Sequence, residues 1–171
     1  AIIGEVELDN GIIARKKDLK IGYLPQESLF DDEDTILEAF YKLLKVDDFV
    51  AKSMLSKFNL NDFSKKIKYL SGGEKKRNEI IQMKLLKPTI AMLDEIDSGL
   101  DVDALQVVAN SVKEVTERNG CALVVSHYAR FYQMIKPTHV HVIVDGKILL
   151  TGDETIVEKI DKQGFDWVKA E

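Results

Sequence analysis

The chain has 171 residues, 45% of them apolar, which is enough to bury the core of one domain. Its formal net charge of −5 argues against nucleic-acid binding through a broadly basic surface. A single cysteine, Cys121, excludes an internal disulfide framework and indicates a reducing compartment, so we expect a cytoplasmic protein. Since no apolar run approaches the roughly 20 residues that a membrane-spanning helix needs, we expect no membrane span.

The first 25 residues are expected to be rich in β-strands. Residues 5–8 and 12–15 flank a turn signal at residues 9–11, and a third strand is predicted over residues 19–24. We therefore expect an antiparallel β segment in this part of the chain.

Residues 26–88 are expected to form a helical subdomain. Asp34 is a candidate N-cap for a helix that ends near residue 45, and a second helix is predicted from about residue 47 to residue 58. Both helices carry apolar side chains at helical spacing, which is typical of core packing rather than of a ligand site.

A capping box marks the start of a third predicted helix, over residues 72–86. Ser71 is followed three positions later by Glu74, and two glycines lie between them. The free amides and positive dipole end of such a helix bind anions, and the glycines leave the backbone open to a phosphate. Three cations in the first turns, at residues 75–77, are unfavourable beside this dipole end and so also favour an anion nearby. Taken alone, however, a capped helix start is a common structural feature.

An apolar run over residues 90–93 ends in the carboxylates Asp94 and Glu95. A buried parallel strand brings acidic side chains to its carboxyl end in this way, which predicts phosphate and metal chemistry there. An Asp-Glu pair after a strand is also a frequent helix N-terminus, so the pair is not diagnostic by itself. Asp101 is the predicted N-cap of the next helix, and Cys121 is expected to be a small core residue of a short buried strand over residues 121–125.

The last part of the chain is predicted to contain a strand over residues 138–144, a hairpin turn at residues 145–146, a second strand and helices. His139 and His141 lie on one side of the first strand. They have no acidic or cysteine partner at ligand spacing, so we do not expect a metal site there. Trp167 is expected to anchor the last helix by burial.

Five motifs occur in the order found in ATP-binding-cassette (ABC) ATPases, and the chain resembles the nucleotide-binding domain of that family. They are the Q-loop at Gln26, the LSGGE signature at residues 70–74, the Walker B acids Asp94 and Glu95, the D-loop at residues 97–101 and the switch histidine His127. The resemblance implies an α/β fold with a partial parallel sheet core, an antiparallel β segment and a helical signature subdomain. We expect three parts, which are residues 1–25, 26–88 and 89–171.

The resemblance also implies ATP and Mg²⁺ as ligands, and it gives each motif a role. Asp94 would hold Mg²⁺ through water, and Gln26 would contact both Mg²⁺ and the attacking water. Glu95 would be the general base, and His127 would touch the γ-phosphate. A second ABC ATPase domain, paired head to tail, would share the nucleotide with this chain's Gln26, Ser71, Gly72, Gly73, Glu74 and Asp101.

The family resemblance further implies a phosphate-binding loop, G-x-x-x-x-G-K-[ST], whose amides wrap the β-phosphate. None of the ten glycines supplies this motif, since the one Gly-Lys pair, Gly146-Lys147, is followed by Ile148 and lies in a predicted hairpin turn. By resemblance the loop would end within about two helical turns before the first residue. We therefore expect ATP hydrolysis by the 171 residues alone to be near background.

Residues 70–171 most resemble the SufC-type ATPases of iron–sulfur cluster assembly, through residues 74–78, 97–105 and 163–167. This implies ATP hydrolysis coupled to cluster assembly, with scaffold proteins as partners. Residues 4–40 are more similar to the translation-associated ABC-F proteins. Two alternatives therefore stay open, a recombined or engineered chain that serves as a non-catalytic docking module and an ABC-F fragment that acts on ribosomes. The second alternative predicts basic linkers and another ATPase domain, and neither is present in the sequence.

Overall fold

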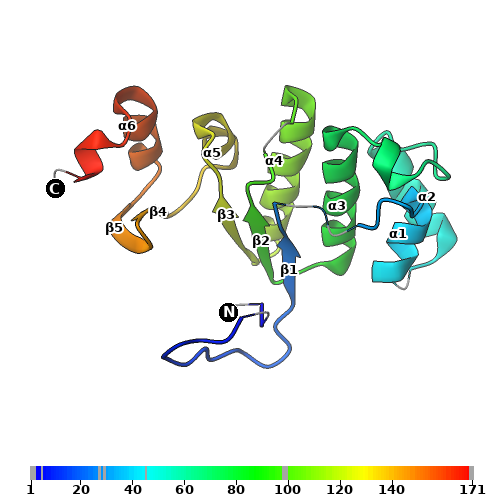
Figure 1. Cartoon of the computed structure of the whole chain (residues 1–171), viewed down its shortest axis with the longest axis horizontal. Coiled ribbons are helices and arrows are strands. Elements are labelled where there is room, and N and C mark those ends of the chain that lie inside the picture. The colour runs from blue at the N-terminus through cyan, green and yellow to red at the C-terminus, as the bar shows by residue number, and fades with distance from the viewer. Residues whose placement is uncertain are drawn as a thin grey trace. The chain divides into compact units, whose positions relative to one another are not determined.

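The computed structural model describes residues 3–4, 6–26, 28, 30–44, 46–97 and 100–169. The chain forms two compact units, residues 1–125 and residues 126–171. The elements of the first unit, in chain order, are β1 (Ile21–Leu24), α1 (Ile36–Leu43), α2 (Asp48–Lys57), a 3₁₀ turn (Ile67–Tyr69), α3 (Gly72–Leu86), β2 (Ile90–Asp94), α4 (Val102–Glu117) and β3 (Cys121–Val125). The second unit contains α5 (Ala129–Ile135), β4 (Val140–Val144), β5 (Lys147–Gly152), α6 (Thr155–Gln163) and a second 3₁₀ turn (Asp166–Lys169) (Figure 1).

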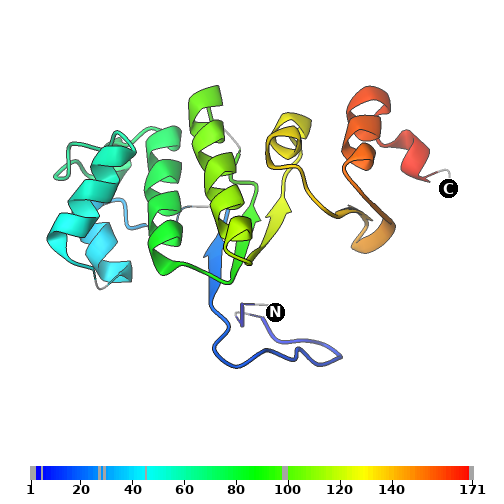
Figure 2. The same cartoon turned by 180° about the vertical axis from the view of Figure 1, so that it is seen from behind.

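A parallel sheet of three strands, in the order β1-β2-β3, is the centre of the first unit. The helix α3 contacts β1 and lies beside it in both views, and α4 contacts β2 and β3 and lies behind the strands in Figure 1 and in front of them in Figure 2. Ala91 and Leu93 of β2 are buried on the sheet face that the helices cover. The predicted parallel core is confirmed, and all three carboxyl ends lie at one edge.

Cys121 is exposed at the start of β3 and is not the core residue that we predicted. Side chains alternate between the two faces of a strand. Ala122 pairs with the buried Ala91, so it shares the helix-covered face, and Cys121 points to the other face of the sheet.

The helical part of the first unit has its own apolar core, formed by α1, α2 and the turn that follows them. Its fully buried side chains include Phe40, Leu55, Leu60 and Ile67. The second helix begins at its predicted cap, because the carboxylate of Asp47 accepts a hydrogen bond from the Phe49 amide at 2.9 Å.

The cap of α1 is Thr35 and not Asp34, which corrects the predicted start by one residue. The Thr35 hydroxyl accepts from the Glu38 amide at 3.2 Å, and the Glu38 carboxylate accepts from the Thr35 amide at 2.8 Å. This reciprocal pair satisfies two helix-end donors, which a single Asp34 cap would not do. Asp34 instead forms an ion pair with Lys42 at 2.7 Å.

The predicted N-terminal antiparallel strands are wrong, since residues 6–20 contain no strand and form the blue loop of Figure 1. Val6 and Ile12 are 66% and 94% exposed. A two-stranded hairpin is marginal in water unless an apolar face is buried, and these side chains are not covered. Of the three predicted strands only β1 forms, and it pairs in parallel with β2.

The second unit is built on an antiparallel hairpin of β4 and β5, as predicted. Asp145 and Gly146 both have positive φ, at 49° and 75°, which is the backbone of a type I′ turn. Val142, Ile156 and Val168 form the core of this unit, and Trp167 packs against them as predicted. The Lys159 ammonium lies 3.5 Å from the centre of the Trp167 ring. None of the helices described in either unit has the length and apolar character needed to cross a membrane.

Candidate functional site

The carboxyl ends of β1 and β2 bring three of the predicted site residues together. The Gln26 side-chain amide donates to Glu95 Oε2 at 2.8 Å, although these residues are 69 positions apart. The Tyr23 hydroxyl donates to Asp94 Oδ2 at 3.5 Å. Because β1 and β2 are parallel neighbours, the residues that follow them meet at the same edge of the sheet.

Glu95 has a backbone conformation that turns it out of the strand. Its φ is 45°, in the left-handed region that side chains other than glycine rarely adopt. Its amide still donates to the Val125 carbonyl at 2.9 Å, so the residue stays attached to β3. A left-handed residue costs about 1–2 kcal/mol, and here it directs the carboxylate to the side chain of Gln26.

The signature segment forms the predicted capping box. The Ser71 hydroxyl accepts from the Glu74 amide at 3.2 Å, and Glu74 Oε2 accepts from the Ser71 amide at 2.8 Å. Ser71 and Gly72 are exposed. The start of α3, predicted to bind an anion, is therefore open to a ligand.

Lys65 reinforces this cap, since its ammonium lies 3.1 Å from Glu74 Oε1. Desolvation raises the pKa of Glu74, but the hydrogen bonds from Ser71 and Lys65 outweigh it and hold that pKa below its usual value. Glu74 therefore stays ionised, and its negative charge stabilises the positive N-terminal end of α3.

Two of the three cations that follow the signature, Lys75 and Lys76, have protein partners and so do not indicate an anion, whereas Nε of Arg77 is buried without a hydrogen-bond partner among the described residues. Lys75 pairs with Asp32 at 3.0 Å, and Lys76 pairs with Glu79 at 3.0 Å. These carboxylates offset the repulsion between the lysine cations and the positive end of α3 without any ligand. A contact that joins Lys75 to a loop 43 residues away cannot be read from local spacing.

The remaining motif residues are distributed over both units. Asp101 caps α4 as predicted, accepting from the Ala104 amide at 2.7 Å. Residues 98–99 of the D-loop lie outside the described residues. His127 belongs to the second unit, where its ring centre lies 4.5 Å from that of Tyr128. Its predicted approach to the γ-phosphate, like the nucleotide role of Asp101, stays a prediction.

The residue types at the sheet edge fit Mg²⁺. This ion is usually held by one or two carboxylates together with phosphate oxygens and water. Asp94 and the side-chain oxygen of Gln26 are ligands of the required kind. Among the described residues no group of three or more His, Cys, Asp or Glu side chains is placed to hold a metal ion, at this edge or in any other part of the chain. His141 bonds to Thr151 at 2.8 Å.

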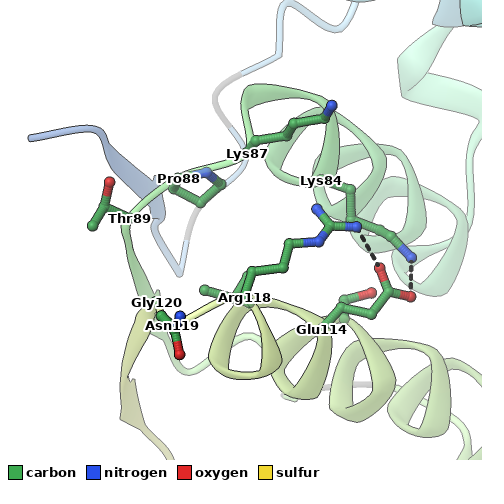
Figure 3. A pocket seen from close by; sticks show the side chains of 10 residues that line it. Lys84, Lys87, Pro88, Thr89, Glu114, Arg118, Asn119 and Gly120 are labelled. Atoms are coloured by element: carbon green, nitrogen blue, oxygen red, sulfur yellow. Dashed lines mark hydrogen bonds and ion pairs between the residues drawn. The ribbon is translucent and has the colours of Figure 1, made fainter.

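A separate cavity of about 160 Å³ lies where α3 and α4 end (Figure 3). Two of its cations share one carboxylate, because Lys84 and Arg118 reach Glu114 at 2.7 Å and 3.9 Å. Helix C-termini disfavour anions. We assign no ligand to this cavity.

A parallel sheet with two acids and a glutamine at its carboxyl edge, beside a capped glycine-containing helix, agrees with the ABC class. The family model described as ABC transporter matches residues 1–98, and the chain belongs to this family.

Comparison with single proteins gives the same class. The chain is 40% identical over 148 residues to the probable ATP-dependent transporter SufC of Escherichia coli, covering 85% of this chain and 55% of that protein. A probable ATP-dependent transporter of Synechocystis is 39% identical over 145 residues, which cover 85% of this chain and 52% of that protein. The chain thus spans about half the length of the curated relatives it matches.

A solved ATP-binding subunit of an ABC transporter has the same fold. Its TM-score is 0.67 at 19% identity, and the match covers 88% of this chain and 67% of that subunit. At this identity the likeness supports the fold alone.

Proposed function

We propose that this chain acts as an ATPase domain of the SufC type, working in a head-to-tail pair with a second ABC domain. The contact of Gln26 with Glu95, beside Asp94, carries the proposal, because it assembles a candidate general base and metal ligands at one sheet edge. The resemblance of residues 70–171 to SufC-type ATPases supports a role in iron–sulfur cluster assembly, with scaffold proteins as docking partners.

In this proposal Glu95 accepts a proton from the attacking water, and the Gln26 amide holds the carboxylate in place. Positioned acid–base catalysis contributes about 10²- to 10⁴-fold. Bound Mg²⁺ would neutralise charge on the phosphates, with Asp94 and Gln26 as its protein ligands. At the start of α3, the exposed amides and the Ser71 hydroxyl would bind the phosphates of a nucleotide held by the partner domain.

The test places the two halves of one nucleotide site on different chains, with the signature segment on this chain and the P-loop on the second chain. The 171 residues contain no P-loop motif, so the second chain is an intact SufC-type domain whose own signature serine is substituted. Binding of Mg²⁺-ATP is measured by calorimetry and turnover by phosphate release, for each chain alone and for the mixture. We expect turnover to appear in the mixture only.

Ser71→Ala should abolish this turnover. Thr35→Ala is the matched control, because Thr35 forms the same type of capping box at the start of α1. Both variants lose a cap worth about 1 kcal/mol, but only Ser71 is placed at the shared nucleotide. If the mixture is inactive, or if Ser71→Ala keeps full activity, the proposed half-site is wrong, and absence of all binding would support the docking-module alternative.

A further inference from the structure

Lys76, in the second turn of α3, is buried, and its ammonium group makes two hydrogen bonds and one ion pair. Nζ donates to the Pro25 carbonyl at 3.1 Å and to the Gln26 carbonyl at 3.3 Å, and it lies 3.0 Å from Glu79 Oε2. Two of the three ammonium donors therefore have carbonyl acceptors, and the Glu79 carboxylate is the ion-pair partner, although neither of its oxygens accepts a hydrogen bond among the described residues. Lys76 is 8% exposed and Glu79 is 3% exposed, so water contributes little to this arrangement.

The main chain that Lys76 contacts has little other support. Among the residues described, no main-chain to main-chain hydrogen bond outside the helices and strands involves Pro25 or Gln26. Pro25 also lines a cavity of about 120 Å³ between β1 and α3, which Glu79 borders as well. The fixed contacts of this loop include the bonds from the Lys76 ammonium group to its carbonyls and the bond from the Gln26 side chain to Glu95.

The same loop residue reaches the candidate general base. Lys76 holds the Gln26 carbonyl, while the Gln26 side chain donates to Glu95 at 2.8 Å. A chain of polar contacts therefore runs from α3 through Gln26 to the carboxyl end of β2. The contacts at Lys76 are partly buried, so little solvent screens them, whereas the contact of Gln26 with Glu95 is exposed.

We propose that Lys76 is a positioning residue that ties the signature helix to the Q-loop and thereby places the Gln26 amide on Glu95. The carboxylate of Glu79 has the supporting role of holding the ammonium group in the protein interior. This inference rests on the proposed function for the roles of Gln26 and Glu95. The contact of the Lys76 ammonium group with the Pro25 and Gln26 carbonyls, which we call the tether, exists without nucleotide, so it can be tested separately.

The test compares the wild-type chain with the single variant Lys76→Met and with the double variant Lys76→Met/Glu79→Gln. The single variant leaves a buried carboxylate without its partner and is expected to lose stability. The double variant removes that charge as well, but the two loop carbonyls still lack their donor. Lys84→Met/Glu114→Gln is the control, since it removes an ion pair at the other end of the same helix.

The readout is amide hydrogen exchange of the peptide spanning residues 22–30, compared with the β2 peptide in the same sample. We expect exchange in the loop to rise at least about tenfold in both Lys76 variants and to stay unchanged in the control. If the double variant exchanges like the wild type, Lys76 only neutralises Glu79 and the inference is overturned.

The two-chain assay tests the proposed function separately, because its hydrolysing site takes the P-loop and the general base from the partner and only the signature edge from this chain. If the wild-type mixture is inactive, the proposed function fails, and the exchange result still decides whether the tether exists.

Discussion

Replacing Gly73 by alanine separates stability from function at the signature edge. Gly73 is the second residue of α3, and an added Cβ would lie 3.8 Å from the Ala104 Cβ and 3.9 Å from Arg77 Nη1. Both are ordinary van der Waals contacts, so the methyl group fits the folded protein without strain. Alanine also has less backbone freedom to lose on folding, which stabilises a compatible site by about 0.4–1 kcal/mol.

We therefore expect Gly73→Ala to raise the free energy of unfolding by about 0.4–1 kcal/mol, measured by urea denaturation with an unchanged m-value. The thermal midpoint should rise by about 1–4 °C for a chain of this size. In the two-chain assay the same variant should lose most of its turnover, because the methyl group occupies space that a phosphate must enter. A destabilised variant would refute the steric reasoning, and a stabilised variant with full turnover would show that no phosphate approaches Gly73.

Three further predictions follow from the site and its supports. Glu95→Gln should leave turnover of the mixture unchanged, as measured by phosphate release, because the hydrolysing site of the mixture takes its base from the partner; a loss of about 10²- to 10⁴-fold would show that Glu95 acts at that site instead. The folded pKa of Glu74 lies below its ordinary 4.5, so the stability that its charge contributes is complete above pH 4.5 and is lost as the pH falls through the folded pKa. Urea denaturation at a series of pH values should therefore show the unfolding free energies of wild type and Glu74→Gln converging as the pH falls below about 4.5. Gly120→Ala would place a Cβ 2.6 Å from the Val115 carbonyl oxygen, and it should destabilise by about 1–3 kcal/mol in urea. A loss below about 0.5 kcal/mol, which is typical of surface substitutions, would contradict this packing argument.

Helix ends were predictable where the signal is local. The limits of α3 match the prediction, because Ser71 and Glu74 define its start and Pro88 follows its end. The start of α1 was misplaced although the same rule applies, since Thr35 precedes Glu38 by three residues and Asp34 does not form such a pair. A reciprocal Thr–Glu pair is therefore a stronger cap signal than a single acidic residue before a helix.

Strand pairing was harder to predict, because it depends on residues that are distant in sequence. The alternation and turn signal of residues 5–15 predicted a hairpin, but those patterns do not say whether another element covers the apolar face. The orientation of β1 was wrong for a related reason. Its partner is β2, which follows about 65 residues later, and the helices between them make a parallel crossover possible.

Lys76 shows which part of the site local reasoning misses. Its pairing with Glu79 three residues later was readable as a helical ion pair. The acceptors that explain its burial are carbonyls 50 and 51 residues away, and a main-chain carbonyl leaves no trace in the side-chain pattern. Gln26 and Glu95 were named from motif order, but the contact between them required the fold.

The two ends of this polar path have different positions in the proposed dimer. In a head-to-tail pair, the signature edge of one chain contacts the nucleotide held by its partner, while Glu95 serves the chain's own Walker B site. The contacts from α3 through Lys76 and Gln26 to Glu95 would then connect two nucleotide sites within a single chain. Any movement of α3 on engaging a phosphate at Ser71 would reach the second site through Lys76, because its ammonium bonds to the loop that holds the base.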